Sequence, residues 1–253
     1  MLSKLWRTTV VLGAAALLAG ATALTTTSTA GADTQVCDKY GSVRVSGGRY
    51  IVQNNEWGDT TTQCLSVRDN GFTITTADHN KPTNGAPASY PSIYAGCHYG
   101  NCTSGSGLPR QVANFHSVQS SVAYTVASGQ WDASYDIWFD PNPNPSGQNT
   151  GAELMIWGNH QGAPQPVGSK IATAWIGGAS WDVWFGNTGW NVISYVRTSP
   201  TTSLNVDIGA FTSDSVGRGR ISRSWYLTSI QFGFEPWQGG TGLGVQSFST
   251  SVS

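Results

Sequence analysis

The sequence predicts an all-β domain, a sandwich or barrel of antiparallel strands, from two observations. From residue 49 onward, short runs rich in Val, Ile, Tyr, Trp and Thr are interrupted by Gly, Pro and Asn about every ten residues. Gly (31 of 253 residues) and Trp (11) are abundant, whereas only 11% of residues are charged. This composition excludes coiled coils, collagen and charge-rich disordered chains.

The predicted strands share β-branched and aromatic residues bounded by turn residues. In chain order they are residues 49–54, 72–76, 118–126, 134–139, 152–157, 170–176, 180–185, 191–196, 226–234 and 244–251. Residues 204–211 predict a helix, because Leu204, Ile208 and Phe211 recur at the spacing of one helical face. Since no linker interrupts this series, we expect one catalytic domain over residues 33–253.

The first residues have the pattern of a secretory signal. Lys4 and Arg7 precede an apolar run over residues 10–23, and the small residues 30–32 fit a cleavage site. The run is shorter than the roughly 20 residues that cross a bilayer, although a retained anchor is the alternative. We therefore expect a signal peptide over residues 1–32 and a secreted, extracellular protein without membrane association once the signal is removed.

Four cysteines agree with an oxidising compartment: Cys37, Cys64, Cys97 and Cys102. Three pairings are possible, and we favour Cys37 with Cys64 and Cys97 with Cys102. The alternative is a metal site, since His98 adjoins Cys97, but the paired close spacings of a zinc motif are missing. We expect no metal and no organic cofactor.

The charge balance limits the partners. With 13 Lys+Arg against 14 Asp+Glu, the chain offers no basic field for nucleic acid or for an anionic membrane. A surface made mostly of Ser, Thr, Asn, Gln and Gly suits neutral ligands. We expect a monomer that binds no nucleic acid.

Residues 152–157 alternate between two faces of a strand. Leu154 and Ile156 face one way with Ala152, and Glu153, Met155 and Trp157 face the other. The first set suits the core between two sheets. The second set places an acid beside a thioether and an indole, which is natural in a cleft.

Residues 231–237 and 134–140 repeat this pattern. Phe232 and Phe234 would point to the core, whereas Glu235 and Trp237 point away, with Gly233 leaving space across the strand. In the other run, the cleft face would carry Asp136 and Trp138. Each acid taken alone could be an ordinary exposed strand residue, but two of the three Glu residues in the chain fall in such settings.

Paired carboxylates among aromatic side chains are the groups that glycoside hydrolysis needs. One carboxyl is held protonated to donate to the leaving oxygen, and the other is ionised to attack or to activate water. Indole faces stack on sugar rings, and neutral amides such as Asn55 and Gln231 can bind hydroxyl groups.

Three segments closely resemble signature segments of glycoside hydrolase family 12, the small secreted endo-β-1,4-glucanases: residues 153–157 (ELMIW), 232–236 (FGFEP) and 54–58 (NNEWG). The resemblance covers nearly all of residues 33–253, including the early cysteine pair. It implies a β-jelly roll sandwich of two curved antiparallel sheets with one short helix, and a substrate cleft for cellulose and related β-glucans on the concave sheet.

The resemblance also implies roles. Glu153 would be the nucleophile of a retaining mechanism, Glu235 the acid/base and Asp136 the acid that orients Glu153, while Trp57 would be a sugar platform on the non-reducing side. Retention requires carboxyl groups roughly 5 to 5.5 Å apart, so we expect both Glu residues to face one another from neighbouring strands. The pair Cys97–Cys102 and residues 159–169 depart from the fungal pattern.

Other residues receive no site role. We expect Glu56 to be an ordinary loop residue and the four histidines to be surface or structural: His79, His98, His116 and His160. Core packing is expected for the remaining tryptophans, Trp131, Trp175, Trp181, Trp184, Trp190 and Trp225. A jelly-roll hydrolase directed at xyloglucan or xylan, or a non-catalytic carbohydrate-binding protein, remains an alternative.

Overall fold

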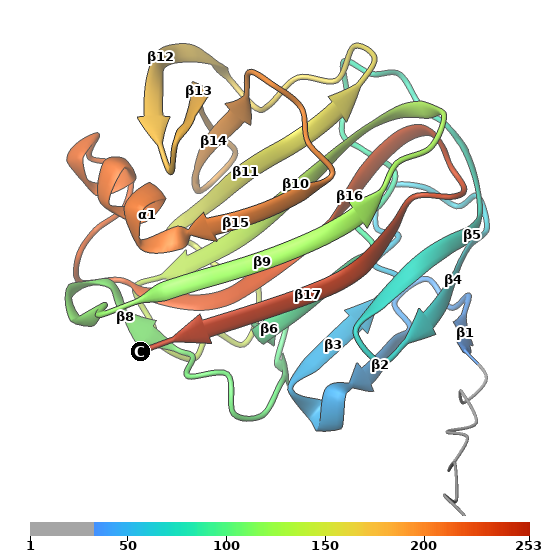
Figure 1. The fold of residues 1–253 in the computed structure, drawn as a ribbon, viewed down its shortest axis with the longest axis horizontal. Coiled ribbons are helices and arrows are strands. Elements are labelled where there is room, and N and C mark those ends of the chain that lie inside the picture. The colour runs from blue at the N-terminus through green and yellow to red at the C-terminus, as the bar shows by residue number, and fades with distance from the viewer. Residues whose placement is uncertain (1–32) are drawn as a thin grey trace, which may run out of the picture. The chain divides into compact units, whose positions relative to one another are not determined.

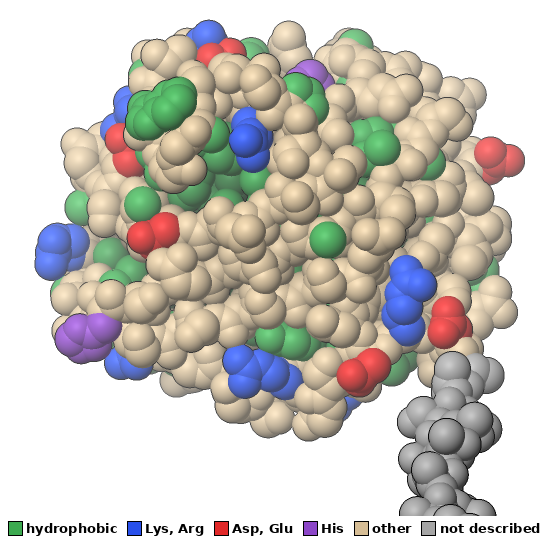
Figure 2. Space-filling model, in the orientation of Figure 1, with side chains coloured by type: hydrophobic (Ala, Val, Ile, Leu, Met, Phe, Trp, Pro, Cys, Tyr) green, Lys and Arg blue, Asp and Glu red, His purple; other side chains and the backbone are tan. Residues whose placement is uncertain are grey.

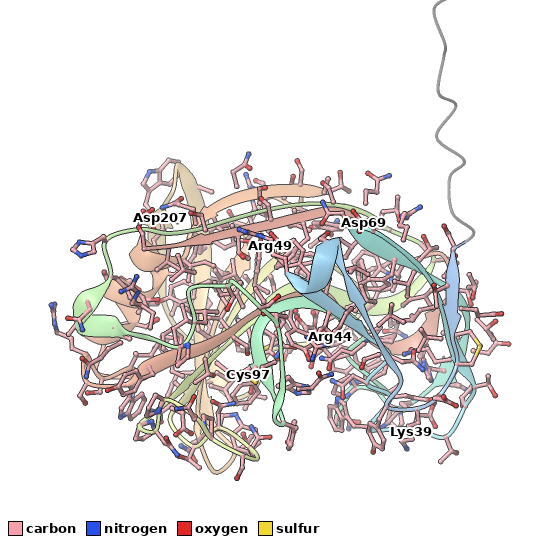
Figure 3. All side chains as sticks on the ribbon, turned by 90° about the horizontal axis from the view of Figure 1, so that it is seen from below. Lys39, Arg44, Arg49, Asp69, Cys97 and Asp207 are labelled. Carbon is pink, nitrogen blue, oxygen red and sulfur yellow. A yellow bond between two sulfur atoms is a disulfide. The ribbon has the colours of Figure 1, made fainter. Side chains whose placement is uncertain are left out.

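The computed structural model describes residues 33–253, which form two curved β-sheets packed face to face (Figure 1). The expected signal peptide lies outside the described residues. Each predicted strand is present, so the all-β prediction is confirmed. Figure 3, turned by 90°, shows Arg49, Asp69 and Asp207 beside one layer and Cys97 and Lys39 on the opposite side.

One layer is the outer sheet, whose strands are all antiparallel to their neighbours. Its spatial order is β1 (Thr34–Val36), β4 (Gln63–Arg68), β5 (Gly71–Asn80), β17 (Gly244–Val252), β9 (Val118–Thr125) and β15 (Ser203–Asp207).

The second layer is the cleft sheet, in which only the β11–β14 pair is parallel among the described strands. Its order is β2 (Ser42–Val45), β3 (Tyr50–Gln53), β6 (Ser92–His98), β16 (Tyr226–Gly240), β10 (Gly129–Asp140), β11 (Ala152–Gln161), β14 (Asn191–Arg197), β13 (Ala179–Asn187) and β12 (Ser169–Ile176). Smaller elements are β7 (Asn101–Cys102), β8 (Arg110–Gln111), the 3-10 turns Ser46–Gly48 and Val112–Asn114, and α1 (Ile208–Gly217).

The core fills the space between the sheets with aromatic rings. Phe232 lies 5.0 Å from both Tyr124 and Tyr135, and Phe234 packs edge-on against Phe72. These contacts match the prediction that Phe232 and Phe234 face inward. Because their neighbours along β16 must face the other way, the core fixes which side chains enter the cleft.

The predicted helix is correct in its second half only. Leu204 lies in β15, opposite Val122 of β9, and is buried by strand alternation. Helix α1 begins after Asp207, whose side chain accepts a hydrogen bond from Ala210 N at 3.2 Å. This N-cap marks where the helix starts, so the spacing between Leu204 and Ile208 spans a strand-to-helix boundary. In α1, Phe211 packs on the core.

Strand β16 runs past its predicted end at residue 234. The prediction stopped there because Pro236 cannot donate a ladder hydrogen bond. In the structure Pro236 lies where the β10–β16 register shifts, between residues 130 and 131. The irregularity accommodates Pro236, so the strand continues and places Glu235 and Trp237 on the cleft face.

Both favoured disulfides are present, Cys37–Cys64 and Cys97–Cys102. The surface in Figure 2 is largely uncharged, with isolated basic and acidic side chains, in agreement with the composition. Among the helices of residues 33–253, none is long and apolar enough to span a bilayer.

Candidate active site

A cavity of about 1480 Å³ lies on the cleft sheet and is lined by residues of β3, β10, β11, β16 and the adjoining loops. It collects every residue of the predicted site: Asn55, Trp57, Asp136, Trp138, Glu153, Met155, Trp157, Glu235 and Trp237. The strand alternation therefore selected one face correctly. The expected amide Gln231 does not line the cavity.

Glu153 and Glu235 project from strands on either side of β10. Glu153 of β11 is opposite Trp138, and Glu235 of β16 is opposite Asp132. The expectation of neighbouring strands was wrong, because β10 lies between them. Curvature of the sheet brings both carboxyl groups to one cleft, where the charge of Glu153 acts on Glu235.

Glu153 is held by an indole that the sequence analysis had assigned to the core. Trp190 Nε1 donates to Glu153 Oε2 at 2.8 Å, and the Trp190 ring lies 5.6 Å from the ring of Trp138. Burial raises the pKa of Glu153, and the hydrogen bond from Trp190 opposes that rise by stabilising the ionised form. Trp190 lies in the turn between β13 and β14, where no periodicity marks a face.

Asp136 is enclosed between Glu153 and Trp138. Trp138 Nε1 donates to Asp136 Oδ2 at 2.8 Å, whereas Oδ1 is buried without a partner. Burial raises the pKa of Asp136 well above its usual value, and the charge of Glu153 raises it further. Asp136 is therefore the protonated member of its pair with Glu153, which suits it to donate to the nucleophile carboxylate.

The pKa of Glu235 is also raised well above its usual value. Burial is the largest cause, followed by the charge of Asp132, the hydrogen bond with Asp132 and the charges of Glu153 and Asp136. Close carboxyl groups cannot all ionise, and only Glu153 has an indole donor that favours its charged form. The site thus holds Glu153 ionised and Glu235 protonated.

The loop before β4 carries Asn55 and Trp57 into the cleft. Asn55 has a positive φ of 43°, and its carbonyl accepts a hydrogen bond from Tyr90 N at 2.9 Å. Trp57 is 45% exposed, so its ring is free to stack on a sugar. Trp237 is instead buried, with Nε1 bonded to Gly85 O.

A chain of amides replaces the expected role of Gln231. Gln231 is fully buried, and its Oε1 accepts from Gln53 Nε2 at 3.1 Å. Gln53 Oε1 in turn lies 2.9 Å from His98 Nδ1, so this nitrogen carries a proton. Burial lowers the pKa of His98 to about 4, which leaves the ring neutral and Nε2 as an acceptor. His98 lines the cleft, a position that the sequence did not indicate.

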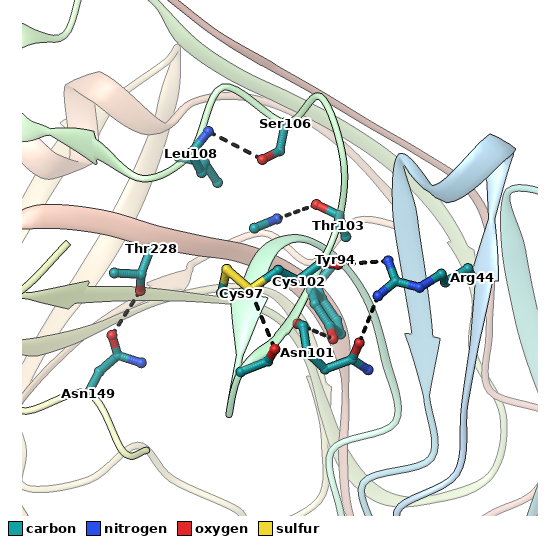
Figure 4. Close-up of a disulfide and its surroundings, with 12 residues drawn as sticks. Arg44, Tyr94, Cys97, Asn101, Cys102, Thr103, Ser106, Leu108, Asn149 and Thr228 are labelled. Atoms are coloured by element: carbon teal, nitrogen blue, oxygen red, sulfur yellow. Dashed lines mark hydrogen bonds between the residues drawn. A yellow bond between two sulfur atoms is a disulfide. The ribbon is translucent and has the colours of Figure 1, made fainter. Parts of the chain in front are cut away.

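The Cys97–Cys102 hairpin positions this part of the wall (Figure 4). Arg44 Nη1 donates to Cys102 O at 2.7 Å, and Tyr94 Oη donates to Asn101 O at 3.0 Å. The cysteines that flank His98 are bonded to each other, so they offer no thiolate to a metal. In the described part of the chain, no group of three or more His, Cys, Asp or Glu side chains is arranged for a metal ion.

Glu56 and His79 lie in a buried polar cluster outside the cleft lining. Glu56 is 4% exposed and its Oε1 has no partner, so it is not an ordinary surface loop residue. His79 bonds Asp59 through Nδ1 and Gln63 through Nε2, both at 2.9 Å. This cluster anchors the loop that carries Asn55 and Trp57.

An aromatic cleft with opposed carboxyl groups on a jelly-roll sandwich defines a class of protein, the polysaccharide hydrolases. Residues 48–253 match Glycosyl hydrolase family 12, and the chain belongs to this family. It is therefore a glycoside hydrolase, which confirms the resemblance noted in the sequence.

Three relatives illustrate the match. "Probable cellulase Cel12b" of Mycobacterium tuberculosis is 44% identical over 59% of this chain and 99% of its own. "Xyloglucan-specific endo-beta-1,4-glucanase A" of Emericella nidulans is 30% identical over 82% of this chain and 87% of its own. The solved structure "Endoglucanase cel12A from Rhodothermus marinus" is 47% identical, with a TM-score of 0.84 over 87% of this chain and 99% of its own.

Proposed function

We propose that the chain is a secreted, monomeric endo-β-1,4-glucanase that cleaves internal bonds of cellulose and related β-glucans with retention of configuration. The observation that carries this proposal is the opposition of Glu153 and Glu235 across one aromatic cleft, with donors that favour opposite protonation states. Cellulase and endoglucanase relatives support the substrate class. We further propose that the enzyme acts extracellularly and needs no cofactor.

In the first step, Glu153 attacks the anomeric carbon while Glu235 protonates the departing glycosidic oxygen. The new ester bond at Glu153 removes its negative charge, so Glu235 becomes able to act as a base. In the second step, Glu235 takes a proton from water, which attacks the same carbon and releases Glu153. Two inversions leave the product in the β configuration.

Asp136 and Trp190 prepare Glu153 for this attack. The indole N–H of Trp190 stabilises the ionised carboxylate before attack. We propose that Asp136, kept protonated by burial and by the charge of Glu153, donates from Oδ1 to the nucleophile. Trp57 would stack on a sugar ring on the non-reducing side, and Trp138, Met155 and Trp157 would line the floor.

Reducing-end release tests the function. Wild-type protein is expected to hydrolyse carboxymethyl-cellulose and barley β-glucan, whereas Glu153→Gln and Glu235→Gln lose most turnover while remaining folded. Asp136→Asn is expected to retain weak activity. The matched control is Asp78→Asn, which makes the same chemical change at an exposed position of β5.

Several outcomes would contradict the proposal. Activity on xyloglucan or xylan alone would replace the substrate, and the relative specific for xyloglucan makes that comparison necessary. Sugar binding without hydrolysis by the wild type would identify a carbohydrate-binding protein. Near-wild-type rates for either Glu variant would exclude the pair as the catalytic residues.

A further inference from the structure

Asp132 lies beneath Glu235 and takes no part in the steps described above. It is directly opposite Glu235 in the β10–β16 pair, so the two side chains share the cleft face of the sheet. Asp132 is 0% exposed and does not line the cavity, unlike Glu235. Substrate cannot reach Asp132, so any effect on the reaction must pass through a neighbour.

The hydrogen bonds of Asp132 are incomplete. Oδ1 accepts from Ser134 Oγ at 2.7 Å, whereas Oδ2 is buried and receives no donor within residues 33–253. A buried carboxylate oxygen without a donor is unfavourable. Two ionised carboxyl groups cannot donate to each other, but one proton held between Asp132 and Glu235 supplies the missing bond.

The surroundings favour one shared proton over none. The groups that act on the pair from adjoining elements are acidic: Glu153, Asp136, Tyr90 and Tyr124. Tyr90 donates its hydroxyl to Ser134 O rather than to either carboxyl group. Because no opposite charge is among these groups, the pair titrates as a unit in which the second ionisation is strongly disfavoured.

We propose that Asp132 is the positioning residue for the acid/base: it fixes the Glu235 carboxyl through the shared proton, and its negative charge keeps that proton on Glu235 until a glycosidic oxygen accepts it. Ser134 supports this division, since its hydroxyl stabilises the ionised form of Asp132. After the first step, the Asp132 charge strengthens Glu235 as a base toward water. This inference rests on the proposed function and deepens it.

The test compares Asp132→Asn with wild type in a pH profile of kcat/KM on barley β-glucan. The variant removes the like charge and adds an amide donor, and both changes favour ionised Glu235. The basic limb of the profile is therefore expected to move to lower pH by about one unit or more. An unmoved basic limb in the folded variant would overturn the proposal. Asp78→Asn is the control.

A second substrate separates positioning from a merely structural role. Hydrolysis of 2,4-dinitrophenyl β-cellobioside needs little acid assistance, because its leaving group is already a weak base. Above the basic limb, Asp132→Asn is expected to lose about tenfold in kcat/KM on β-glucan but less than about threefold on the aryl cellobioside. Equal losses on both substrates would contradict the proposal.

Ser134→Ala keeps the test decisive if Asp132→Asn does not fold. Loss of the hydroxyl moves the shared proton toward Asp132, so kcat/KM on β-glucan is expected to fall while the aryl cellobioside is spared. Failure of the proposed function has a different signature: wild type would be inactive on both substrates, or Glu235→Gln would remain active on β-glucan. A fully active wild type with unchanged Asp132 and Ser134 variants would reject the inference alone.

Discussion

Replacing Trp190 by Phe tests how the nucleophile is kept ionised. The substitution removes the indole N–H that lies 2.8 Å from Glu153 Oε2 but leaves an aromatic ring near Trp138. A hydrogen bond to a charged acceptor contributes about 1.5 to 3 kcal/mol, and one pKa unit corresponds to about 1.4 kcal/mol. The pKa of Glu153 should therefore rise by about one to two units in the variant.

The sign of the kinetic effect follows from the role of Glu153. Attack requires the ionised carboxylate, so the acidic limb of kcat/KM against pH reports the pKa of the nucleophile in the free enzyme. In Trp190→Phe this limb is expected to move to higher pH by about one unit or more, with tenfold lower activity below it for each unit.

The assay is reducing-end release from barley β-glucan between pH 3 and 9. Trp175→Phe is the matched control, because Trp175 is 74% exposed and lies outside the cleft lining. A folded Trp190→Phe variant with an unshifted acidic limb would refute the argument. A uniform loss at every pH would also contradict it, since that result indicates misplaced substrate rather than a changed ionisation.

Three further predictions concern other groups. Asp59→Asn should destabilise the fold by up to about 1 kcal/mol near pH 7: burial raises the pKa of Asp59, but His79 and backbone bonds lower it to about 2, so the wild-type advantage in urea unfolding should fade as pH drops from about 4 toward 2. The same advantage at all pH values would contradict this. His98→Phe should raise KM about threefold to tenfold with little change in kcat, through loss of a neutral acceptor; an unchanged KM would remove His98 from the binding surface. NMR of the first product anomer should show β, and α would exclude retention.

Strand alternation explains why the cleft residues could be predicted. In residues 152–157, Leu154 and Ile156 must enter the core, so Glu153 and Trp157 face the cleft without further information. The same reasoning placed Glu235. The family resemblance then supplied roles that a face alone cannot give.

The missed features depend on contacts between distant segments. Trp190 sits in a turn, and only the fold brings it to Glu153, which precedes it by 37 residues. Gln231 has the predicted face, but Gln53 of β3 covers it. Asp132 acquires its importance from the register of β10 against β16, which no local pattern encodes.

The central claim is that Glu153 is the nucleophile, and covalent trapping tests it most directly. Incubation with 2-deoxy-2-fluoro-β-cellobiosyl fluoride should leave a glycosyl ester that accumulates, because the fluorine slows its hydrolysis. Mass spectrometry of the digested protein is expected to find the label on Glu153, with none in the Glu153→Gln variant. A label on Glu235 or Asp136, or time-dependent inactivation that survives in Glu153→Gln, would contradict the account.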